Sequence, residues 1–536
     1  MTTDNTHDNS FGWPEMLGLA GFFLVGLLLI THHEMWGDEL QHWAIAQASG
    51  SVGEIFDNLE YESSPALWHM ILYPVTRVTH NPEAMQHVHL LLATLATAVF
   101  LRWSPFGRAQ KLLFIFGYFP LYEYGVISRH YVLGELLLFV FLALYPWRGW
   151  RAIAAAAALF LVAHSSFFGL IFAVAGAAAM TVRHLGQAHA PGRGRHWQLI
   201  VPLVIVVVGC LWSLVQIMPQ QDAGLHPAWD FITGWHALQA ATTPWRAVVP
   251  LTRFDYLFWN TNILDPSSFA GLWNADHLAS LLGQALLSAV IVIGSSWYFC
   301  RRREALVFFL VIVISCAVFF YLKKRGYARH HGHLYLAWIG ALWLVWRAQW
   351  DTMRSSTVRR PRAASQIGMA TLVLLVLAAH VVAGVYAAVM DYRHPFASSA
   401  QAASLIRAQG RQDDVIIANA AIGALLDRDV YLPHERRSGR FHVWRHANKK
   451  LTPGELVEWA EQLHRTHAKP VLIVLPEPIA NTETMTRVEL IGIFTDTLNR
   501  NGRHAIYTLR TESSVAPAPS VAEPGLDRKT TGDATN

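Results

Sequence analysis

Long apolar runs are the feature that most constrains this chain of 536 residues. A bilayer core of roughly 30 Å needs about 20 apolar residues in a helix to cross it. Hydrophobic residues make up 53% of the chain and charged residues only 15%, a balance typical of membrane proteins. Runs of membrane length lie at residues 13–30, 84–101, 200–218, 278–299, 305–322 and 368–390, and shorter ones at 112–126, 131–145, 153–163, 167–181 and 334–346.

These runs predict a mostly α-helical, polytopic membrane bundle of about eleven spans. Arginines precede and follow residues 153–180, and like charge at both ends favours a hairpin that turns at His164-Ser165-Ser166 over one long helix. One set of alternate loops carries twice as many Lys and Arg residues as the other. By the positive-inside rule the richer set is cytoplasmic, which places the N-terminus inside and loops 31–83 and 219–277 outside.

The net charge of +5 resides in the cytoplasmic loops and does not indicate a nucleic-acid partner. Arg far outnumbers Lys, and the chain has no Asn-x-Ser/Thr sequon. Both features fit a bacterial inner membrane protein.

The composition changes after residue 390. Three short apolar runs, 415–418, 471–475 and 505–509, alternate with helix-like stretches such as 453–467. This pattern predicts a small α/β domain at residues 391–512 that follows the membrane domain, residues 1–390. Eleven spans would make this domain extracytoplasmic. Residues 513–536, rich in Pro, Ala and Thr, are expected to be a disordered tail.

An acidic pair, Asp38 and Glu39, follows the first span on the predicted outer face. Carboxylates at the mouth of an apolar bundle are costly to hold without a cation, a basic ligand or a proton, so the pair marks a candidate reaction site. Asp38 could instead act as the N-cap of a helix over residues 40–48.

A basic cluster on the same face is the second candidate feature. It comprises Lys323, Lys324, Arg325 and Arg329. We expect an anionic ligand there, although the cluster could also be a solvated loop near lipid headgroups.

Five motifs in order carry a family resemblance: WGDELQHW from residue 36, ESSPALWHMIL from 62, YEYGVISRHYVLGELL from 122, VAHSSFFGL from 162 and GYARHHGHLYLAW from 326. Together they resemble membrane glycosyltransferases of the GT-C superfamily, in the bacterial branch related to lipid-A sugar transferases and protein O-mannosyltransferases. The resemblance covers roughly residues 10–350. The second proline of the small-Pro-Pro motif is missing, Ile127 replaces a usual glutamate, and His330 replaces a usual tyrosine.

The resemblance implies an inverting glycosyltransferase that takes a sugar from a polyprenyl-phosphate donor and passes it to a lipid, glycan or protein acceptor on the outer face. Asp38 is the predicted base, with Glu39 as a second catalytic candidate. The donor phosphate would bind Arg129, Lys323, Lys324, Arg325 and Arg329. The alternative function is a non-catalytic carrier, flippase or scaffold for polyprenyl-linked glycans.

Asp38, Glu39 and Glu123 could also hold a divalent cation, Mg or Mn. Alternatively, Glu123 could be a helix-end residue capped by Arg129. The predicted lining of the sugar or acceptor site comprises Trp36, His42, Tyr61, His130, Tyr131, His164 and His330.

Overall fold

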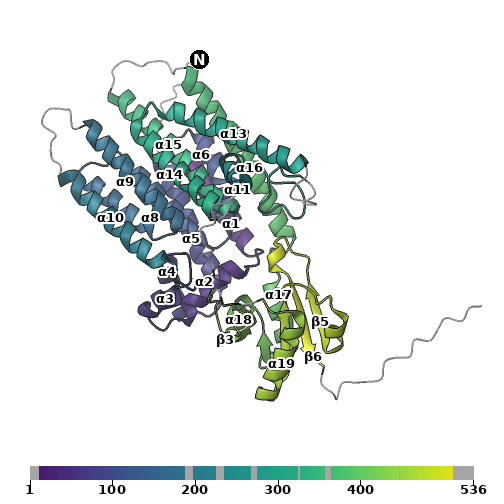
Figure 1. The fold of residues 1–536 in the computed structure, drawn as a ribbon. Helices are drawn as coiled ribbons and strands as arrows, with labels where there is room; N and C mark the ends of the chain where they lie inside the picture. The colour runs from purple at the N-terminus through teal and green to yellow at the C-terminus, as the bar shows by residue number, and fades with distance from the viewer. Residues whose placement is uncertain are drawn as a thin grey trace, which may run out of the picture.

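A computed structural model describes residues 11–187, 197–224, 234–266, 275–323, 326–355, 364–445, 447–448 and 450–510. Its helices form a bundle, and an α/β region packs against one end of that bundle (Figure 1). Two predicted site residues, Lys324 and Arg325, and the predicted tail lie outside the described residues.

Seven helices are long and apolar enough to cross a membrane, so the chain is a multi-pass membrane protein. They are α1 (Trp13–Ile30), α5 (Glu83–Trp103), α9 (Phe167–Gln187), α10 (Trp197–Ile217), α13 (Ala275–Phe299), α14 (Arg303–Leu322) and α16 (Ala364–Arg393). Three further helices complete the bundle: α7 (Tyr131–Ala143), α8 (Trp150–Ala163) and α15 (Ala328–Ser355). The predicted number of eleven spans is not confirmed, because several predicted runs form helices that are short or interrupted.

The predicted span at residues 112–126 is not one helix. It divides into α6 (Arg108–Ile115) and a π-helical turn, η1 (Tyr118–Glu123). Pro120 lies inside this segment, where it cannot donate a backbone hydrogen bond. The turn packs against α15 and α16, and its residues are buried. The interruption therefore places Tyr124 and Glu123 inside the protein.

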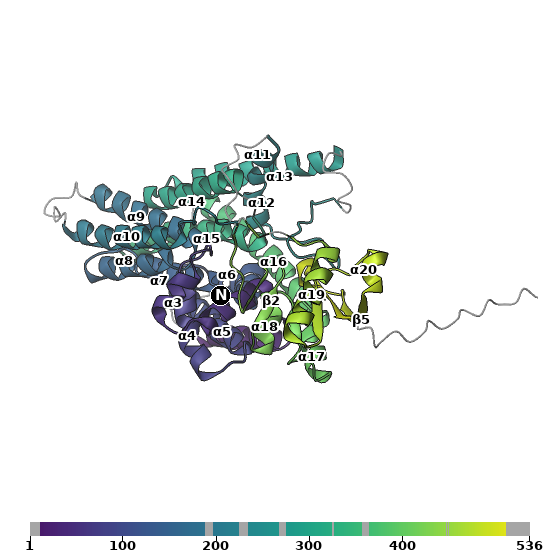
Figure 2. The ribbon, with the colours of Figure 1, turned by 60° about the horizontal axis from the view of Figure 1, so that its bottom comes forward.

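The predicted hairpin at residues 164–166 is confirmed, since α8 ends at Ala163 and α9 begins at Phe167. Five shorter helices of the described chain lie in the two long loops. They are α2 (Gly37–Ala48), α3 (Val52–Asn58), α4 (Leu67–Val78), α11 (Gly234–Ala241) and α12 (Thr243–Val248). Helices α8, α9 and α10 lie on the side of the bundle away from the α/β region (Figure 2).

The C-terminal α/β region is a six-stranded mixed sheet with strand order β3-β2-β1-β4-β6-β5. Its strands are β1 (Val415–Ile417), β2 (Val430–Leu432), β3 (Arg437–Gly439), β4 (Val471–Leu475), β5 (Val488–Phe494) and β6 (His504–Leu509). Its helices are α17 (Ser399–Ala408), α18 (Ala420–Leu426), α19 (Pro453–His467), α20 (Thr482–Thr486) and the 3₁₀ turn η2 (Arg500–Gly502). The three predicted strands and the helix 453–467 are confirmed.

Each face of this sheet has its own apolar core, since side chains of successive strand residues point to opposite faces. Ile417 and Ile473 pack with Leu456 of α19, whereas Ile416 packs with Ile406 of α17 and Ile422 of α18. Helix α18 in turn packs against α2 of the bundle.

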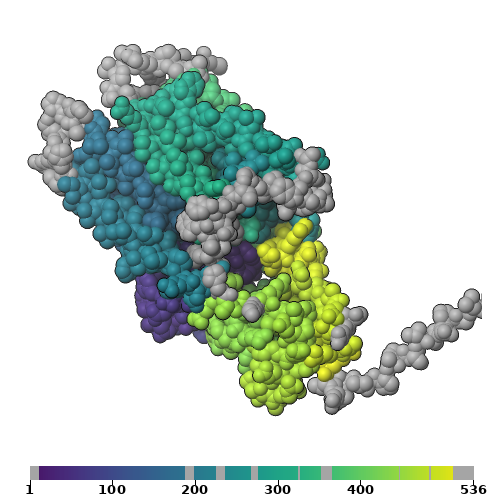
Figure 3. All heavy atoms as spheres, viewed as in Figure 1, coloured from purple at the N-terminus to yellow at the C-terminus, as the bar shows by residue number. Residues whose placement is uncertain are grey.

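Backbone hydrogen bonds join the β5–β6 connection to the segment that follows α16. The amides of Leu498 and Asn499 donate to the carbonyls of Pro395 and Phe396, and the Ser398 amide donates to Gly502. This places residues 498–502 against the end of the bundle, where the surface is hollowed between the two parts of the molecule (Figure 3).

The predicted orientation can be tested with single cysteines in a protein whose own three cysteines are replaced. We expect Arg465→Cys in α19 to react with a membrane-impermeant maleimide added to spheroplasts, because the α/β region is predicted to face outward. Arg148→Cys, in the connection between α7 and α8, should react only after the membrane is opened. The reverse pattern would show that the predicted orientation is wrong.

Candidate active site

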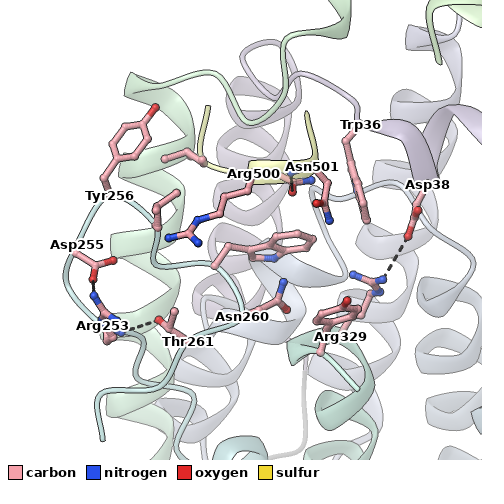
Figure 4. Close-up of a pocket in the computed structure, with 15 residues that line it drawn as sticks. Trp36, Asp38, Arg253, Asp255, Tyr256, Asn260, Thr261, Arg329, Arg500 and Asn501 are labelled. Atoms are coloured by element: carbon pink, nitrogen blue, oxygen red, sulfur yellow. Dashed lines mark hydrogen bonds and ion pairs between the residues drawn. The ribbon is translucent and has the colours of Figure 1, made fainter. Parts of the chain in front are cut away.

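The first turn of α2 carries the predicted acidic pair. Helix α2 begins at Gly37, and its N-cap is Trp36, whose backbone N–H donates to Glu39 Oε2 at 3.2 Å. Asp38 is therefore not the N-cap, which corrects that alternative. Glu39 satisfies the cap, and the Asp38 side chain is left to point away from the helix end (Figure 4).

The Asp38 carboxylate binds two arginines from distant parts of the chain. Oδ2 accepts from Arg129 at 2.6 Å and from Arg329 at 3.2 Å. The Asp38 side chain is 39% exposed, whereas those of Arg129 and Arg329 are 11% and 7% exposed. Three predicted site residues thus meet at one oxygen, and the carboxylate is reachable from outside.

Both arginines have N–H groups that no described residue accepts. Arg129 Nε, Arg329 Nε and one terminal nitrogen of Arg329 are buried without a hydrogen-bond partner in the described structure. Arg329 also lies over the rings of Trp36 and Tyr327, at 5.4 and 4.8 Å. Buried donors without a partner are rare in proteins, and guanidinium groups pair well with phosphate oxygens. The pair therefore offers a binding site for an anion.

Glu39 has a different environment from Asp38. It is fully buried, and its Oε1 accepts from the Ser128 backbone N–H at 2.6 Å. Its Oε2 lies 3.1 Å from His33 Nε2, and His33 Nδ1 lies 2.7 Å from Asp391 Oδ2 at the end of α16. Burial opposes a charge on His33, but the carboxylates of Asp391 and Glu39 raise its pKa well above the usual value. Glu39 thus connects α2 to Ser128 and His33, and through His33 to Asp391 of α16. Its carboxylate is enclosed by protein.

Asp38 and Arg329 line a cavity of about 850 Å³ between the bundle and the α/β region (Figure 4). This volume is in the range that encloses a whole small ligand. The lining comes from four segments: Trp36 and Asp38; residues 253, 255–257 and 259–261; Tyr327 and Arg329; and residues 498–501.

Most of the predicted lining residues lie elsewhere, and only Trp36 among them lines this cavity. His42 lies between His69 and His130, with nitrogen–nitrogen distances of 3.0 and 3.4 Å. Burial lowers the pKa of His42 well below its usual range and that of His69 to about 3. This histidine chain is therefore neutral near pH 7.

The other predicted lining residues are engaged in packing. The Tyr61 hydroxyl donates to Asp222 at 3.0 Å, and His164 Nδ1 lies 2.8 Å from the Phe160 carbonyl oxygen. His330 stacks on Phe168, and Tyr131 lies beneath the Arg129 guanidinium at 5.4 Å. Lys323, the C-cap of α14, does not line the cavity.

Asp38, Glu39 and Glu123 do not form a metal-ligand set. The Glu123 side chain accepts from the Tyr118 hydroxyl and Trp259 Nε1, which also corrects the expectation that Arg129 caps it. Glu39 contacts three protein groups, the backbone N–H groups of Trp36 and Ser128 and the His33 ring, and Asp38 contacts two guanidiniums. No group of three His, Cys, Asp or Glu residues in the described ranges is arranged to hold a metal ion.

Several site residues were missed in the sequence. Asn260 has a left-handed backbone with φ of 65°, and its Oδ1 accepts from the Ala328 backbone N–H at the start of α15. A strained polar residue in a loop often marks a functional position, but a sequence does not reveal a positive φ outside glycine. Arg500 and Asn501 were missed because they lie in a domain whose contacts with the bundle no local pattern indicates.

Glu62 is a further missed residue, close to the Asp38 and Arg129 pair. Its Oε1 accepts from Gln41 at 2.7 Å and from Trp444 at 3.3 Å. Burial raises the pKa of the Glu62 carboxyl to about 7, and the Asp38 charge adds to this effect. This carboxyl is therefore partly protonated at neutral pH.

Comparison with solved structures finds a similar fold. No family model matches the chain, and no curated protein matches it in sequence. The crystal structure of ArnT from Cupriavidus metallidurans bound to undecaprenyl phosphate is similar over 93% of this chain and 98% of that one, with a TM-score of 0.46 and 14% sequence identity.

Replacing Glu39 should reduce the stability of the protein. In Glu39→Gln the contacts to His33 and Ser128 lose the negative charge, so we expect a loss of about 3 kcal/mol in the free energy of unfolding. Thermal denaturation of the detergent-purified protein measures the effect. Asp57→Asn, an exposed carboxylate in α3, is the control. Equal melting temperatures for both variants and the parent would contradict this role.

Proposed function

We propose that this protein is a GT-C-type glycosyltransferase that moves a sugar from a polyprenyl-phosphate donor to an acceptor hydroxyl, at the extracytoplasmic face and with inversion. The observation that carries the proposal is the meeting of Asp38, Arg129 and Arg329 at one oxygen beside the cavity. The motifs that resemble the GT-C superfamily contain the same three residues.

Arg129 and Arg329 are the proposed ligands of the donor phosphate. Their unpartnered N–H groups are buried next to Asp38, so they are already held in place before a ligand arrives. Donors that are fixed in advance stabilise negative charge at little cost in reorganisation. As the bond between the anomeric carbon and the phosphate oxygen breaks, these guanidiniums would stabilise the charge on the departing polyprenyl phosphate.

Asp38 is the proposed base. The paired guanidiniums favour its charged form, which is the form that can accept a proton. Both guanidiniums contact Oδ2, and the side chain is partly exposed to the cavity from which the acceptor hydroxyl would approach. The acceptor oxygen attacks the anomeric carbon, its proton passes to Asp38, and the bond to phosphate breaks. One displacement of this kind inverts the anomeric centre.

The proposed reaction is written without a divalent cation, because Asp38 pairs with two guanidiniums and Glu39 accepts from Trp36 and Ser128 and contacts His33. Lys323, Lys324 and Arg325 remain proposed contributors of positive charge near the phosphate. Glu39 acts as a positioning residue, since its bond to the Ser128 amide fixes the backbone next to Arg129.

Asp38→Asn should abolish most of the turnover. The amide cannot accept the hydroxyl proton, and loss of a general base typically costs about 10²–10⁴-fold in rate. The measurement is transfer of radiolabelled sugar from a polyprenyl-phosphate donor to cell-envelope acceptors by protein in liposomes. Asp57→Asn should retain the parent rate.

Turnover by Asp38→Asn at the parent rate would show that the base assignment is wrong. An unmodified protein that moves lipid-linked sugar between leaflets without transferring it would instead establish the carrier alternative.

Arg329→Gln should weaken use of the donor. It removes the guanidinium but keeps a polar side chain beside Trp36, and loss of one such donor group costs about 10²–10³-fold in rate. Arg329→Lys should recover part of that loss, because it restores the charge without the planar fork. The readout is kcat/KM for the donor. A value that is unchanged in Arg329→Gln would exclude a phosphate-binding role.

A further inference from the structure

We infer that the acceptor is a carbohydrate chain, and that Arg500 and Asn501 of the α/β region bind the part of it that lies beyond the reacting hydroxyl. This inference rests on the proposed function and names the acceptor class for the same cavity.

The lining of the cavity is suited to a hydroxyl-rich ligand. Side-chain amides come from Asn260, Asn499 and Asn501, and the aromatic rings come from Trp36, Tyr256, Trp259 and Tyr327. Amides both donate and accept hydrogen bonds, as hydroxyl groups do, and flat aromatic side chains offer apolar surface with a polar edge. Only two lining residues, Leu257 and Leu498, are aliphatic.

A second cavity in the same molecule has an almost entirely apolar lining. It has about 650 Å³ and lies between α1, α6, η1 and α16, where Leu28, Leu112, Val385 and neighbouring apolar residues form nearly all of its lining. The apolar surface of a lipid chain is complementary to the second cavity, whereas the polar side chains beside Asp38 are not complementary to such a chain. The polar composition of the first cavity therefore favours a hydroxyl-rich acceptor over a lipid chain, and a protein acceptor is an outcome that the test below distinguishes.

Charge pairing leaves Arg500 available for a ligand. The cavity is lined by three arginines and two aspartates; Arg253 pairs with Asp255, and Arg329 pairs with Asp38. Among the described residues, no carboxylate forms an ion pair with Arg500, and Arg500 itself is exposed. Its guanidinium can therefore form several hydrogen bonds to a ligand without first breaking a protein contact.

The position of these residues fits a role away from the reacting atoms. The Arg500 side chain extends toward Tyr256 and away from Asp38, and Asn501 lies between Arg500 and Trp36 (Figure 4). Asn499 Oδ1 accepts from the Asn501 backbone N–H, and the backbone bonds to Pro395 and Phe396 hold the turn against the bundle. Gly502 permits this close approach, because a Cβ there would lie 2.7 Å from Ala397 Cβ. These contacts hold residues 498–502 against the bundle, and residues 498–501 form one side of the cavity.

The acceptor class can be read from the labelled product. Full-length protein in liposomes is given a panel of radiolabelled polyprenyl-phosphate sugars and cell-envelope material from cells that lack the protein. We expect label that survives protease and is recovered, after mild acid release, in an oligosaccharide of two or more sugars. Label on a peptide fragment, or on a lipid as a single sugar, would overturn the inference. Complete absence of transfer with every donor would count against the proposed function itself.

Kinetics with that labelled acceptor fraction test the two residues. Arg500→Ala and Asn501→Ala should each raise the acceptor KM, by about tenfold for Arg500, because a charged hydrogen-bond donor is lost. The kcat and the donor KM should change less than about twofold, since neither residue touches the reacting atoms. Arg500→Lys should restore part of the acceptor affinity.

Arg465→Ala, an exposed arginine of α19, is the matched control and should behave as the parent. Circular dichroism and melting temperature establish that each variant is folded. An unchanged acceptor KM in folded Arg500→Ala and Asn501→Ala would overturn the assignment. So would an effect on the donor KM alone, because it would place these residues on the donor.

Discussion

The buried Glu39 carboxylate determines how the proposed site is arranged. It accepts the backbone N–H groups of Trp36 and Ser128 and lies against His33, so one side chain joins the start of α2, the entry to α7 and the end of α1. Arg129 directly follows Ser128 in the sequence, and Asp38 directly precedes Glu39. Their contact at 2.6 Å follows from the position of Glu39. A buried carboxylate that satisfies all its partners specifies one arrangement of the chain.

The adjacent acidic residues therefore have separate tasks, and their exposure accounts for the difference. Asp38 is partly exposed and paired with side chains that have spare hydrogen-bond donors, whereas Glu39 is enclosed and fully engaged. The sequence predicted Asp38 as the base and Glu39 as a second catalytic or metal-binding candidate. We propose that Asp38 keeps the chemical role and that Glu39 positions the residues around it.

Much of the bundle could be predicted from the sequence, because hydrophobic runs and helix length have a simple physical relation in a bilayer. The hairpin at residues 164–166 was predicted correctly from the arginines on both sides of it, and the helix Pro453–His467 from its place between short apolar runs. The interruption at Tyr118–Glu123 was not, since its apolar composition resembles that of a span. Asp38, Arg129 and Arg329 could be nominated from their places at helix ends. Arg500 and Asn501 could not, because their contact with the site depends on how a distant domain packs.

The cavity takes its walls from residues near positions 36, 255, 328 and 500, so its parts are synthesised at widely separated times. The bundle can insert into the membrane, and Asp38 can meet both arginines, while the last strands are still on the ribosome. The wall at residues 498–501 lies between β5 and β6, so it can form only after most of the described chain has been made. A nascent chain would thus hold the charged centre of the site before it could enclose a partner beside it. The cavity beside Asp38 therefore becomes complete only when residues 498–501 reach the bundle.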